Sequence, residues 1–538
     1  MVDLQHAARF WQGKTCVILG LGISNRALLH ALLPKVREDG LQLMVADQKD
    51  FDPAEVKDRL IQQFNLGDLA PVLDEVRWIG GPEYLSVLEK VAQKTSPSEV
   101  LIFRTPFLRP DQAELVEARK KGMVVTSEME LFCHLCPCPI LAVTGSDGKT
   151  TTTTLTAKLL EKLGFTVHLG GNIGTPLIDR LGEIRSEDLV VLELSSFQLM
   201  AFQAQIDYAL LTNISPNHLD YHKDFHEYKR AKANIFAHSA FPTVVINGAS
   251  YDPEWLTLNP TAHWLFLHQA PQIFQGPLWQ IAADGSLGPV DRDVEPVDLN
   301  RKLVNQDGKS LDQALPAPTS EKPFLTTKDI RLRGRFNQDN YLAALALVHE
   351  VYQELGPGSE EDRNRALAEA AKDLAQTFGG VAHRQALVRE EGGVAIYESS
   401  IDSSPTRTLN TILAFRGSGG GEQAGPKPIL IMGGKDKNCD YHDLARLMVK
   451  ETKAAFISGQ NEGLLQAALE EALKEALEAP GFSYTLCKDY KEALEKAMAL
   501  AEPGDNILFT PAGTSFDHFK NFEERGEYFT ELVRKFDK

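Results

Sequence analysis

Buried-strand patterns separated by helical patterns open the chain. The run TCVILGLG at residues 15–22 is almost continuously apolar, ends in Gly-x-Gly and is followed by the helical SNRALLHALL. Further strand patterns lie at residues 41–47, 99–103 and 123–126. This alternation predicts a Rossmann-like α/β domain over residues 1–137. Asn25 stands where the third glycine of the dinucleotide-binding turn is expected, so this turn alone is equally compatible with a plain βαβ unit.

The same alternation resumes after Pro137 and predicts a second domain over residues 138–380. Its strand patterns lie at residues 139–145, 188–194, 207–214 and 243–247, and a helical pattern at 337–355 closes it. Such alternation favours a mostly parallel sheet that binds ligands at the carboxyl ends of its strands. Sequence rich in proline, glutamine and aspartate interrupts the pattern at about 251–330, which we interpret as an insertion.

A third α/β domain is predicted over residues 381–538. Its strand patterns lie at residues 393–397, 428–434, 454–459 and 506–513, and a final helix ends at Lys538. The run GSGGGEQAGPKP at 417–428 has the composition of a surface loop. We see no repeat of fixed period. The prediction is therefore three unlike α/β domains: a Rossmann-like amino-terminal domain, a central P-loop ATPase-type domain with a mostly parallel sheet, and a Rossmann-like carboxyl-terminal domain.

Length and charge narrow the classes of function. A chain of 538 residues is long enough for roughly three or four cores. Its 74 acidic and 56 basic residues give a net charge of −18, which argues against nucleic-acid binding because it repels phosphate backbones. No run approaches the roughly 20 apolar residues of a membrane span, and the amino terminus lacks the apolar core of a signal peptide. We therefore expect a cytoplasmic protein without a membrane span.

Cysteines are sparse, with six in the chain, so a disulfide framework is not expected. Cys133, Cys136 and Cys138 form a C-x-x-C-x-C cluster around His134, which could in principle hold zinc. Because no second ligand pair follows at zinc-finger spacing, reduced thiols in a linker are the favoured interpretation.

The segment LAVTGSDGKTTTTT at residues 141–154 carries the strongest signal for chemistry. An apolar strand breaks into a glycine-containing turn, and a helix restarts at Lys149, which is the layout of a phosphate-binding loop. Gly145 and Gly148 let backbone N–H groups approach an anion, and a threonine hydroxyl at 150 or 151 would reach Mg²⁺. Val143 stands where the first glycine of the eight-residue motif belongs, so the loop is a shortened form. The alternative is a plain glycine turn before a helix.

Candidate metal ligands follow two other predicted strands. Glu193 ends the strand pattern 188–194, and its carboxylate would hold Mg²⁺ directly or through water. His218 and Asp220 follow the next strand, with Lys232 after a helical stretch, and they suggest a second metal position. Each has a structural alternative: a capping acid, a satisfied histidine and a solvated lysine.

The ordered set of motifs resembles the Mur ligases of peptidoglycan synthesis. The matching stretches are TGSDGKTT, GGNIGTP, ELSSFQL, N-x-x-x-N-H-L-D followed by Y-x-x-x-K, and FKNFEERG. The resemblance covers essentially the whole chain apart from 251–330. It implies an ATP-dependent, amide-forming ligase that adds D-glutamate to UDP-N-acetylmuramoyl-L-alanine (UDP-MurNAc-L-Ala) through an acyl phosphate. We expect a monomer whose partners are these small-molecule substrates.

The resemblance also implies roles for individual residues. Those implied for ATP are Gly145, Ser146, Asp147, Gly148, Lys149, Thr150, Thr151, Asn172, Asn337, Asn340, His383 and Arg384. Those implied for two Mg²⁺ ions are Thr150, Glu193, His218 and Lys232, the last as a carbamate formed with CO₂. The catalytic set is Lys149, Glu193, His218 and Lys232. Those implied for the UDP portion are Gly20, Gly22, Ser24 and Asp47. Those implied for D-glutamate are Ser403, Lys437, Ser515, Phe516 and Phe522.

Three stretches depart from the family pattern. Phe336 replaces the histidine common in the family's H-N-x-x-N helix. The residues 399–403 read SSIDS in place of an Asp-Ser-Lys-Ala-Thr run, so only Ser403 is carried over there. The segment RTPFLRP at 104–110 lacks the glycine that usually follows proline in the phosphate-contacting turn, which leaves the role of that turn open.

Two other functions stay open. The chain could be another Mur or folylpolyglutamate-type ligase that adds a different amino acid, although FKNFEERG and Lys437 favour D-glutamate. It could also be a P-loop regulator that binds nucleotide without ligating anything. That reading leaves GGKDK and TSFDHFKNF in the third domain without a purpose.

Overall fold

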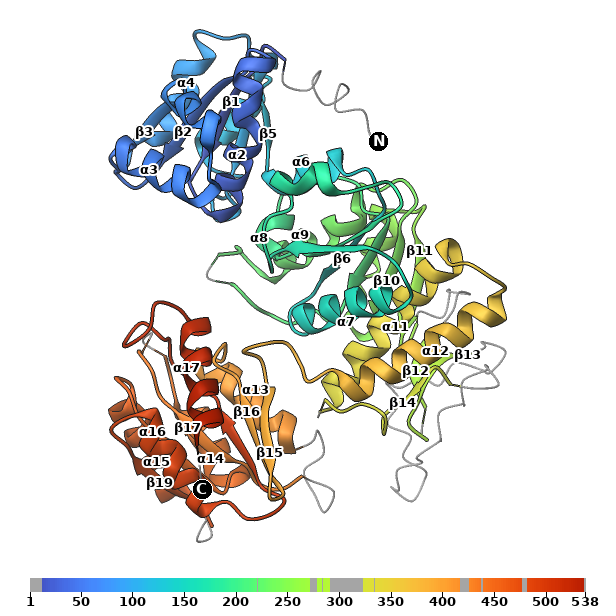
Figure 1. The fold of residues 1–538 in the computed structure, drawn as a ribbon, viewed down its shortest axis with the longest axis vertical. Helices are drawn as coiled ribbons and strands as arrows, with labels where there is room; N and C mark the ends of the chain where they lie inside the picture. Colours follow the sequence, from blue (N-terminus) through green and yellow to red (C-terminus); the bar gives the residue numbers. More distant parts are fainter. Residues whose placement is uncertain are drawn as a thin grey trace. The chain divides into compact units, whose positions relative to one another are not determined.

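Three β-sheets with their helices form the part of the chain that the computed structural model describes (Figure 1). The described residues are 12–219, 221–270, 278–282, 284–290, 323–332, 334–416, 425–436, 439–476 and 481–536. They fall into two compact units, the first made of Met1–Thr326 with Asn340–Ala371 and the second of Thr327–Asp339 with Lys372–Lys538. The first unit holds two of the sheets, and the second unit holds the third.

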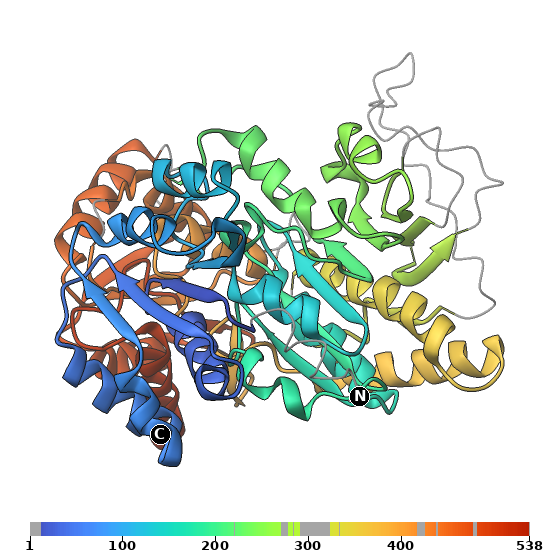
Figure 2. The ribbon, with the colours of Figure 1, turned by 90° about the horizontal axis from the view of Figure 1, so that it is seen from above.

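The first sheet is parallel throughout, with strand order β3-β2-β1-β4-β5. The central strand β1 is fully buried, as expected of a parallel strand covered on both faces, and strands of this sheet run side by side in Figure 2. The strands are β1 (Thr15–Leu19), β2 (Gln42–Asp47), β3 (Arg77–Gly80), β4 (Val100–Arg104) and β5 (Val124–Thr126). The helices are α2 (Ile23–Glu38), α3 (Pro53–Phe64), α4 (Val87–Ala92), α5 (Ala113–Lys120) and α6 (Glu128–Leu135). The predicted strands are confirmed, whereas β3 was missed because its residues are half-buried or exposed.

The second sheet has the order β14-β13-β12-β11-β10-β9-β6-β8-β7 and is parallel from β7 to β12. Its strands are β6 (Ile140–Thr144), β7 (Val167–Gly171), β8 (Leu189–Glu193), β9 (Tyr208–Leu211), β10 (Thr243–Asn247), β11 (His263–Leu267), β12 (Leu278–Ile281), β13 (Ser286–Val290) and β14 (Leu325–Thr326). Its helices are α7 (Lys149–Lys162), α8 (Ser196–Leu199), α9 (Phe225–Ala237), α10 (Glu254–Leu258), α11 (Arg335–Leu355) and α12 (Glu360–Thr377). The last two contribute residues to both compact units.

The described part of 251–330 extends the second sheet through strands β11 to β14. Trp279 of β12 is fully buried and stacks on Phe324, with ring centroids 5.6 Å apart. The region therefore contributes core, which its proline- and glutamine-rich sequence did not predict. The strands β12 and β14 are too short to give a clear alternating pattern.

The third sheet has the order β15-β16-β20-β17-β18-β19, with only β15 antiparallel to its neighbour. Its strands are β15 (Ala386–Glu391), β16 (Val394–Glu398), β17 (Ile429–Met432), β18 (Ala454–Ile457), β19 (Ser483–Leu486) and β20 (Asn506–Phe509). Its helices are α13 (Pro405–Arg416), α14 (His442–Glu451), α15 (Glu462–Glu475), α16 (Tyr490–Leu500) and α17 (Phe522–Lys535). The final helix thus ends before Lys538, which lies outside the described residues. The fold class predicted from the sequence is confirmed.

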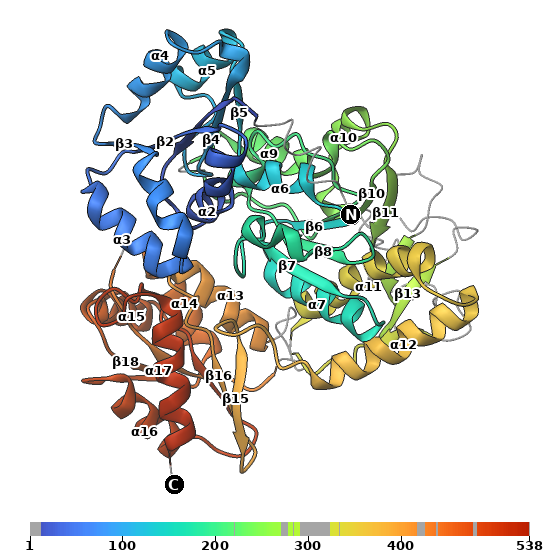
Figure 3. The ribbon, with the colours of Figure 1, turned by 45° about the horizontal axis from the view of Figure 1, so that its top comes forward.

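The register of the second sheet aligns the ends of its central strands. Val143 of β6 pairs with Glu193 of β8, and Thr144 pairs with Leu211 of β9. Helix α7 continues from the loop after β6 and packs over β6, β7 and β8 (Figure 3). The loops that follow these strands therefore lie at one edge of the sheet.

Within the described ranges, no helix is both long and apolar enough to cross a membrane. The six cysteines there are free, and the sulfur atoms of Cys136 and Cys138 lie 3.7 Å apart. No group of three or more His, Cys, Asp or Glu side chains among the described residues is arranged to hold a metal ion. The described residues therefore give no support to the alternative that the cysteine cluster binds zinc.

Candidate active site

Two glycines shape the loop between β6 and α7. Gly145 has φ +152° and Gly148 has φ +76°, which are angles that other residues rarely adopt. A Cβ at Gly145 would lie 1.9 Å from the Thr212 hydroxyl oxygen, and one at Gly148 would lie 2.3 Å from Oδ1 of Asn340. Glycine is therefore required both for the backbone angles and for the close approach of these neighbours. Asn340 also accepts a hydrogen bond from the Thr152 hydroxyl at 3.2 Å, so it lies against the predicted loop.

The segment after β9 anchors this loop. The backbone N–H of Asp147 donates to Oδ1 of Asn213 at 3.0 Å, and the Thr212 hydroxyl donates to the Asp147 carbonyl at 2.6 Å. The Ser146 N–H donates to the Asn213 carbonyl at 2.8 Å. Sequence reasoning did not assign Thr212 or Asn213 a role, although Asn213 is the first residue of the quoted N-x-x-x-N-H motif.

Tyr228 of α9 holds the same loop from another direction. Its hydroxyl lies 2.9 Å from the Ser146 hydroxyl, which in turn donates to the Ser215 carbonyl at 2.9 Å. Burial raises the pKa of Tyr228 to about 12, so the phenol stays protonated at neutral pH. This contact was also missed, because Tyr228 entered only as the first letter of Y-x-x-x-K.

Two lysine amines converge on the Gly145 carbonyl. Nζ of Lys149 donates to it at 3.0 Å and to the Ser146 carbonyl at 2.9 Å. Nζ of Lys232 donates to it at 2.7 Å and to the Thr144 hydroxyl at 3.1 Å. Lys232 is only 1% exposed. Burial, reinforced by the charge of Lys149, holds the pKa of Lys232 well below its usual 10.5.

Glu193 ends β8 and is buried beside Asn172, which follows β7. Oε1 of Glu193 accepts a hydrogen bond from the Asn172 side chain at 2.8 Å. Oε2 is buried and has no hydrogen-bond partner among the described residues. A buried carboxylate oxygen without a donor is costly unless a cation or donor reaches it. The pairing of Glu193 with Asn172 brings together two residues that the sequence predicted separately, and the unpartnered oxygen fits a divalent cation.

His218 lies at an exposed, tightly turned segment after β9. Its φ is +54°, and its carbonyl accepts hydrogen bonds from the N–H groups of Tyr221 and His222 at 3.0 and 2.9 Å. Its ring centroid lies 4.9 Å from that of Phe197 in α8. Asp220 lies outside the described residues.

A buried imidazole that the sequence did not single out lies beside this turn. His222 has its Nε2 2.9 Å from the Ser196 hydroxyl oxygen and its Nδ1 3.7 Å from Oε2 of Glu227. Burial lowers the pKa of His222. One signal for His222 was present in the sequence: it lies four residues after His218, just beyond the N-x-x-x-N-H-L-D motif.

Arg109 lies in the segment 104–110, whose role the sequence left undecided, and it contacts the region around His222 within the first compact unit. Its guanidinium binds Glu227 with a closest distance of 2.9 Å and also donates to the Tyr221 carbonyl. The Tyr221 hydroxyl donates to the Pro106 carbonyl at 3.0 Å. Phe107, where the family has glycine, lies with its ring 5.2 Å from that of Phe197. The turn therefore contacts α8 and the start of α9.

The predicted UDP-binding residues lie at the ends of β1 and β2 and at the start of α2. Oδ2 of Asp47, at the end of β2, accepts a hydrogen bond from the Leu21 N–H at 2.7 Å. A Cβ at Gly20 would lie 2.9 Å from Thr105. The Asn25 amide donates to the Leu19 and Gly20 carbonyls at 3.0 and 2.9 Å, so the residue that replaces the third glycine closes the turn from inside. Gly22 precedes α2 as its N-cap, and Ser24 lies in its first turn.

The second unit gathers several predicted residues around buried polar groups. His383 has φ +64°, and its Nδ1 lies 3.1 Å from Glu398, which raises the pKa of His383. The ring of Phe522 lies 6.2 Å from that of His383. Arg384 follows directly, and its buried Nε has no hydrogen-bond partner among the described residues. Asn337 is buried in the same unit.

Arg525 of α17 joins the two loops that carry most of the predicted D-glutamate residues. It donates to the Ser400 carbonyl at 2.7 Å and to the Gly513 carbonyl at 2.9 Å. Ser403 is half-buried in the first loop, whereas in the second Ser515 is buried and Phe516 is 63% exposed. Lys437 lies outside the described residues. Sequence reasoning missed Arg525, the arginine of FKNFEERG.

In the altered run 399–403, the polar residues Ser399, Ser400 and Asp402 are buried. Asp402 accepts hydrogen bonds from the hydroxyls of Thr411 and Thr510 at 2.7 and 2.9 Å, and burial raises the pKa of this carboxyl. The hydroxyl of Ser400 is buried without a hydrogen-bond partner among the described residues. The run therefore has buried polar side chains, although its sequence differs from the family's Asp-Ser-Lys-Ala-Thr run. Phe336, the other departure, is 39% exposed.

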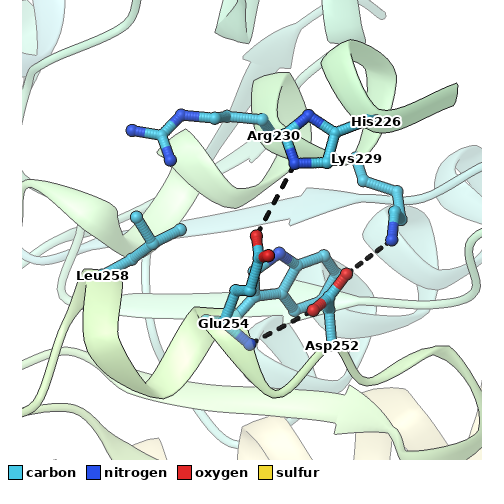
Figure 4. A pocket seen from close by; sticks show the side chains of 7 residues that line it. His226, Lys229, Arg230, Asp252, Glu254 and Leu258 are labelled. Carbon is cyan, nitrogen blue, oxygen red and sulfur yellow. Dashed lines mark hydrogen bonds and ion pairs between the residues drawn. The ribbon is translucent and has the colours of Figure 1, made fainter. Parts of the chain in front are cut away.

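A hollow between α9 and α10 contains none of the predicted residues (Figure 4). Two pairs of side chains line it, Lys229 with Asp252 and His226 with Glu254 at 3.6 Å, and Arg230 borders it as well. The predicted site therefore lies elsewhere on α9, around Lys232.

Comparison with known proteins assigns the family. The description "Mur ligase middle domain" matches residues 143–263, and "Mur ligase, glutamate ligase domain" matches residues 383–513. The UDP-N-acetylmuramoylalanine--D-glutamate ligase of Ruminiclostridium cellulolyticum is 35% identical over 523 residues, which cover 97% of each chain. The chain belongs to the Mur ligase family. The ligase of the same name from Acetivibrio thermocellus is 35% identical over 532 residues, which cover 98% of this chain and 97% of that one.

This membership confirms the resemblance drawn from the motifs and makes the chain a ligase. Mur ligases are ATP-dependent, which agrees with the predicted requirement for ATP. Among solved structures, the Mur ligase MurC of Thermotoga maritima is 16% identical, with 97% of this chain and 99% of that chain covered and a TM-score of 0.48. The family assignment rests on the sequence relatives.

Gly148→Ala tests the shape of the loop in this Mur ligase. The added Cβ meets Asn340 and the backbone is held at positive φ, so we expect a loss of about 1–3 kcal/mol of stability and a much smaller thermal stabilisation by an ATP analogue. Gly164→Ala is the matched control, because Gly164 also has positive φ but has nothing within 4 Å of the added Cβ. Equal stabilisation by the analogue in both variants would contradict the proposed fit of the loop.

Lys232→Met tests the buried amine. Because the pKa of Lys232 in the folded state lies below its usual 10.5, the unfolded chain binds more protons between those two values, and stability rises with pH across that window. In CO₂-depleted buffer at neutral pH, the variant should therefore unfold at a higher temperature than the wild type. Its advantage should shrink as the pH approaches 10.5. Lys229→Met, which removes an amine paired with Asp252, should give no such gain; a pH-independent loss in Lys232→Met would refute the argument.

Proposed function

We propose that the chain joins D-glutamate to UDP-MurNAc-L-Ala with ATP, in cytoplasmic peptidoglycan precursor synthesis. The observation that carries the proposal is the phosphate loop at the strand edge that also bears Glu193, in a chain related over nearly its full length to enzymes named as D-glutamate ligases. We assign the UDP portion of the substrate to residues 1–137, ATP to 138–380 and D-glutamate to 381–538.

The first chemical step converts a poor acyl donor into a good one. A carboxylate resists attack by an amine because its negative charge repels the nucleophile and its oxygen is a poor leaving group. In the proposed step, an oxygen of the L-alanyl carboxylate attacks the γ-phosphorus of ATP, the bond to the β-phosphate oxygen breaks, and ADP leaves. Lys149 and the N–H groups of the loop after β6 would stabilise the charge on the transferring phosphoryl group. The product is an acyl phosphate.

The second step forms the amide. The uncharged amine of D-glutamate attacks the acyl carbon, and the tetrahedral intermediate expels phosphate. A proton must leave the attacking nitrogen, and we place the group that assists this transfer near His218. Water has to be excluded because it would hydrolyse the acyl phosphate.

The residues around Glu193 fit a divalent cation. The unpartnered Oε2 of Glu193 offers a buried anionic ligand. The Thr150 hydroxyl, His218 and a carbamate on Lys232 would complete the sites of two Mg²⁺ ions. When bound, such ions neutralise charge on the phosphates and on the carboxylate that is phosphorylated.

The carbamate requires an uncharged lysine amine, since the nitrogen lone pair attacks CO₂ and then loses a proton. Burial lowers the pKa of Lys232 well below its usual 10.5, which favours that uncharged form. The resulting negative charge would lie near the amine of Lys149, which donates to the same carbonyl. This neighbour would stabilise the carbamate.

For D-glutamate we propose Ser403, Lys437, Ser515, Phe516 and Phe522. For the nucleotide we retain Asn172, Asn340, Asn337, His383 and Arg384. The pairing of His383 with Glu398 and the buried Nε of Arg384 support a polar, charged site in the second unit. The polar run 399–403 supports it too, because Arg525 holds that run beside the loop carrying Ser515.

Phosphate release with UDP-MurNAc-L-Ala and ATP, varying only the amino acid, tests the proposed function. We expect release to depend on D-glutamate and to fall by about a thousandfold in Lys149→Met, because the variant loses a charge that stabilises the transferring phosphoryl group. L-Glutamate and meso-diaminopimelate serve as controls. Dependence on another amino acid would favour a different Mur or folylpolyglutamate-type ligase. Indifference to both substrates would favour a nucleotide-dependent regulator.

A further inference from the structure

A buried histidine with no role in the proposed reaction lies between the two segments assigned to the metal. His222 is 1% exposed, and its Nε2 lies 2.9 Å from the Ser196 hydroxyl oxygen. Ser196 begins α8, three residues after Glu193 at the end of β8. The capping box between Ser195 and Gln198 fixes this helix start, so Ser196 has little freedom to move without the strand end.

The backbone of His222 is bound to the other segment. Its N–H donates to the His218 carbonyl at 2.9 Å, which closes the turn in which His218 adopts positive φ. One residue therefore binds the loop after Glu193 through its side chain and the turn of His218 through its main chain.

Phe197 fills the space between the two imidazoles. Its ring stacks on that of His222, with centroids 5.9 Å apart and an interplanar angle of 6°. The same ring lies 4.9 Å from that of His218. A movement of His222 would displace Phe197 and with it the surface against which His218 packs.

Helix α9 contacts His222 from the other side. Oε2 of Glu227 lies 3.7 Å from Nδ1 of His222, and the Tyr228 ring meets the imidazole edge-on at 5.3 Å. Tyr228 also reaches Ser146 of the phosphate loop. The imidazole thus lies between α8, which follows Glu193, and α9, whose Tyr228 reaches the phosphate loop.

We propose that His222 is a positioning residue that holds the loop after Glu193 and the turn of His218 at a fixed separation for binding a divalent cation. The inference rests on the proposed function, which assigns Glu193 and His218 to the metal. Removing partners that orient groups around a metal typically changes metal affinity by about 10- to 100-fold.

Binding of Mn²⁺ to the full chain, in the presence of a non-hydrolysable ATP analogue, tests this role. Electron paramagnetic resonance measures the free Mn²⁺. His222→Phe keeps a stacking ring but removes the contact with Ser196, and Ser196→Ala removes the same contact from the other side. We expect each variant to weaken Mn²⁺ binding about tenfold. The double variant should bind Mn²⁺ about as tightly as the single variant that binds it less tightly, because both substitutions remove the same contact.

His168→Phe is the matched control. His168 of β7, in the same sheet, also has a partner at 2.9 Å, Asp188, which precedes β8. In the sheet register, His168 pairs with Val190 near the start of β8, whereas Gly171 pairs with Glu193 at its end. His168 therefore lies toward the end of β8 that is opposite Glu193. Its replacement should leave Mn²⁺ binding unchanged, and thermal unfolding of every variant checks that it is folded.

Glu193→Gln separates this inference from the proposed function. If Glu193→Gln weakens Mn²⁺ binding while His222→Phe and Ser196→Ala do not, the role of His222 is wrong and the metal assignment stands. If Glu193→Gln has no effect either, the metal assignment itself is wrong. An equal loss in His168→Phe also overturns the role of His222. Should His222→Phe fail to fold, Ser196→Ala decides the question alone.

Discussion

The parallel register of β6, β8 and β9 is the constraint on which the active site depends. It places Val143 beside Glu193 and Thr144 beside Leu211, so the phosphate loop, the buried carboxylate and the anchoring Thr212 and Asn213 emerge at one edge. A shift of one residue in any of these pairings would turn alternate side chains to the other face of the sheet. The packing that fixes the sheet therefore also fixes the relative positions of groups that come from distant parts of the chain.

The same edge of the sheet contains buried polar groups that lower the stability of the folded protein. Lys232 is an almost fully buried amine, and one oxygen of Glu193 is buried without a donor among the described residues. Both are unfavourable in the protein alone; a cation bound at Glu193 and conversion of Lys232 to the proposed carbamate would offset these costs. Buried charged groups without partners are typical of functional sites, which agrees with the proposal that this edge binds phosphate and metal.

Much of this edge could be predicted from the sequence because its signals are local. The apolar run before Gly145, the helix start at Lys149 and the strand ending in Glu193 each depend on neighbouring residues alone. The half-buried strands β7, β15 and β19 gave no such pattern.

The supporting contacts could not be predicted because they join residues far apart in the chain. Asp147 binds Asn213 from 66 positions away, and Ser146 binds Tyr228 from 82 positions away. These contacts exist only because β9 lies next to β6 although two other strands separate them in sequence. The same reason hid Arg525, whose partners lie in two different loops.

Transfer of an oxygen atom tests the central claim, that this edge phosphorylates a carboxylate, most directly. UDP-MurNAc-L-Ala labelled with ¹⁸O in both oxygens of the alanyl carboxylate is ligated to D-glutamate with unlabelled ATP, and the released phosphate is analysed by mass spectrometry. The account predicts one ¹⁸O atom in each phosphate, because the bridging oxygen of the acyl phosphate leaves with phosphorus when the amide forms. Unlabelled phosphate accompanying amide formation would contradict it.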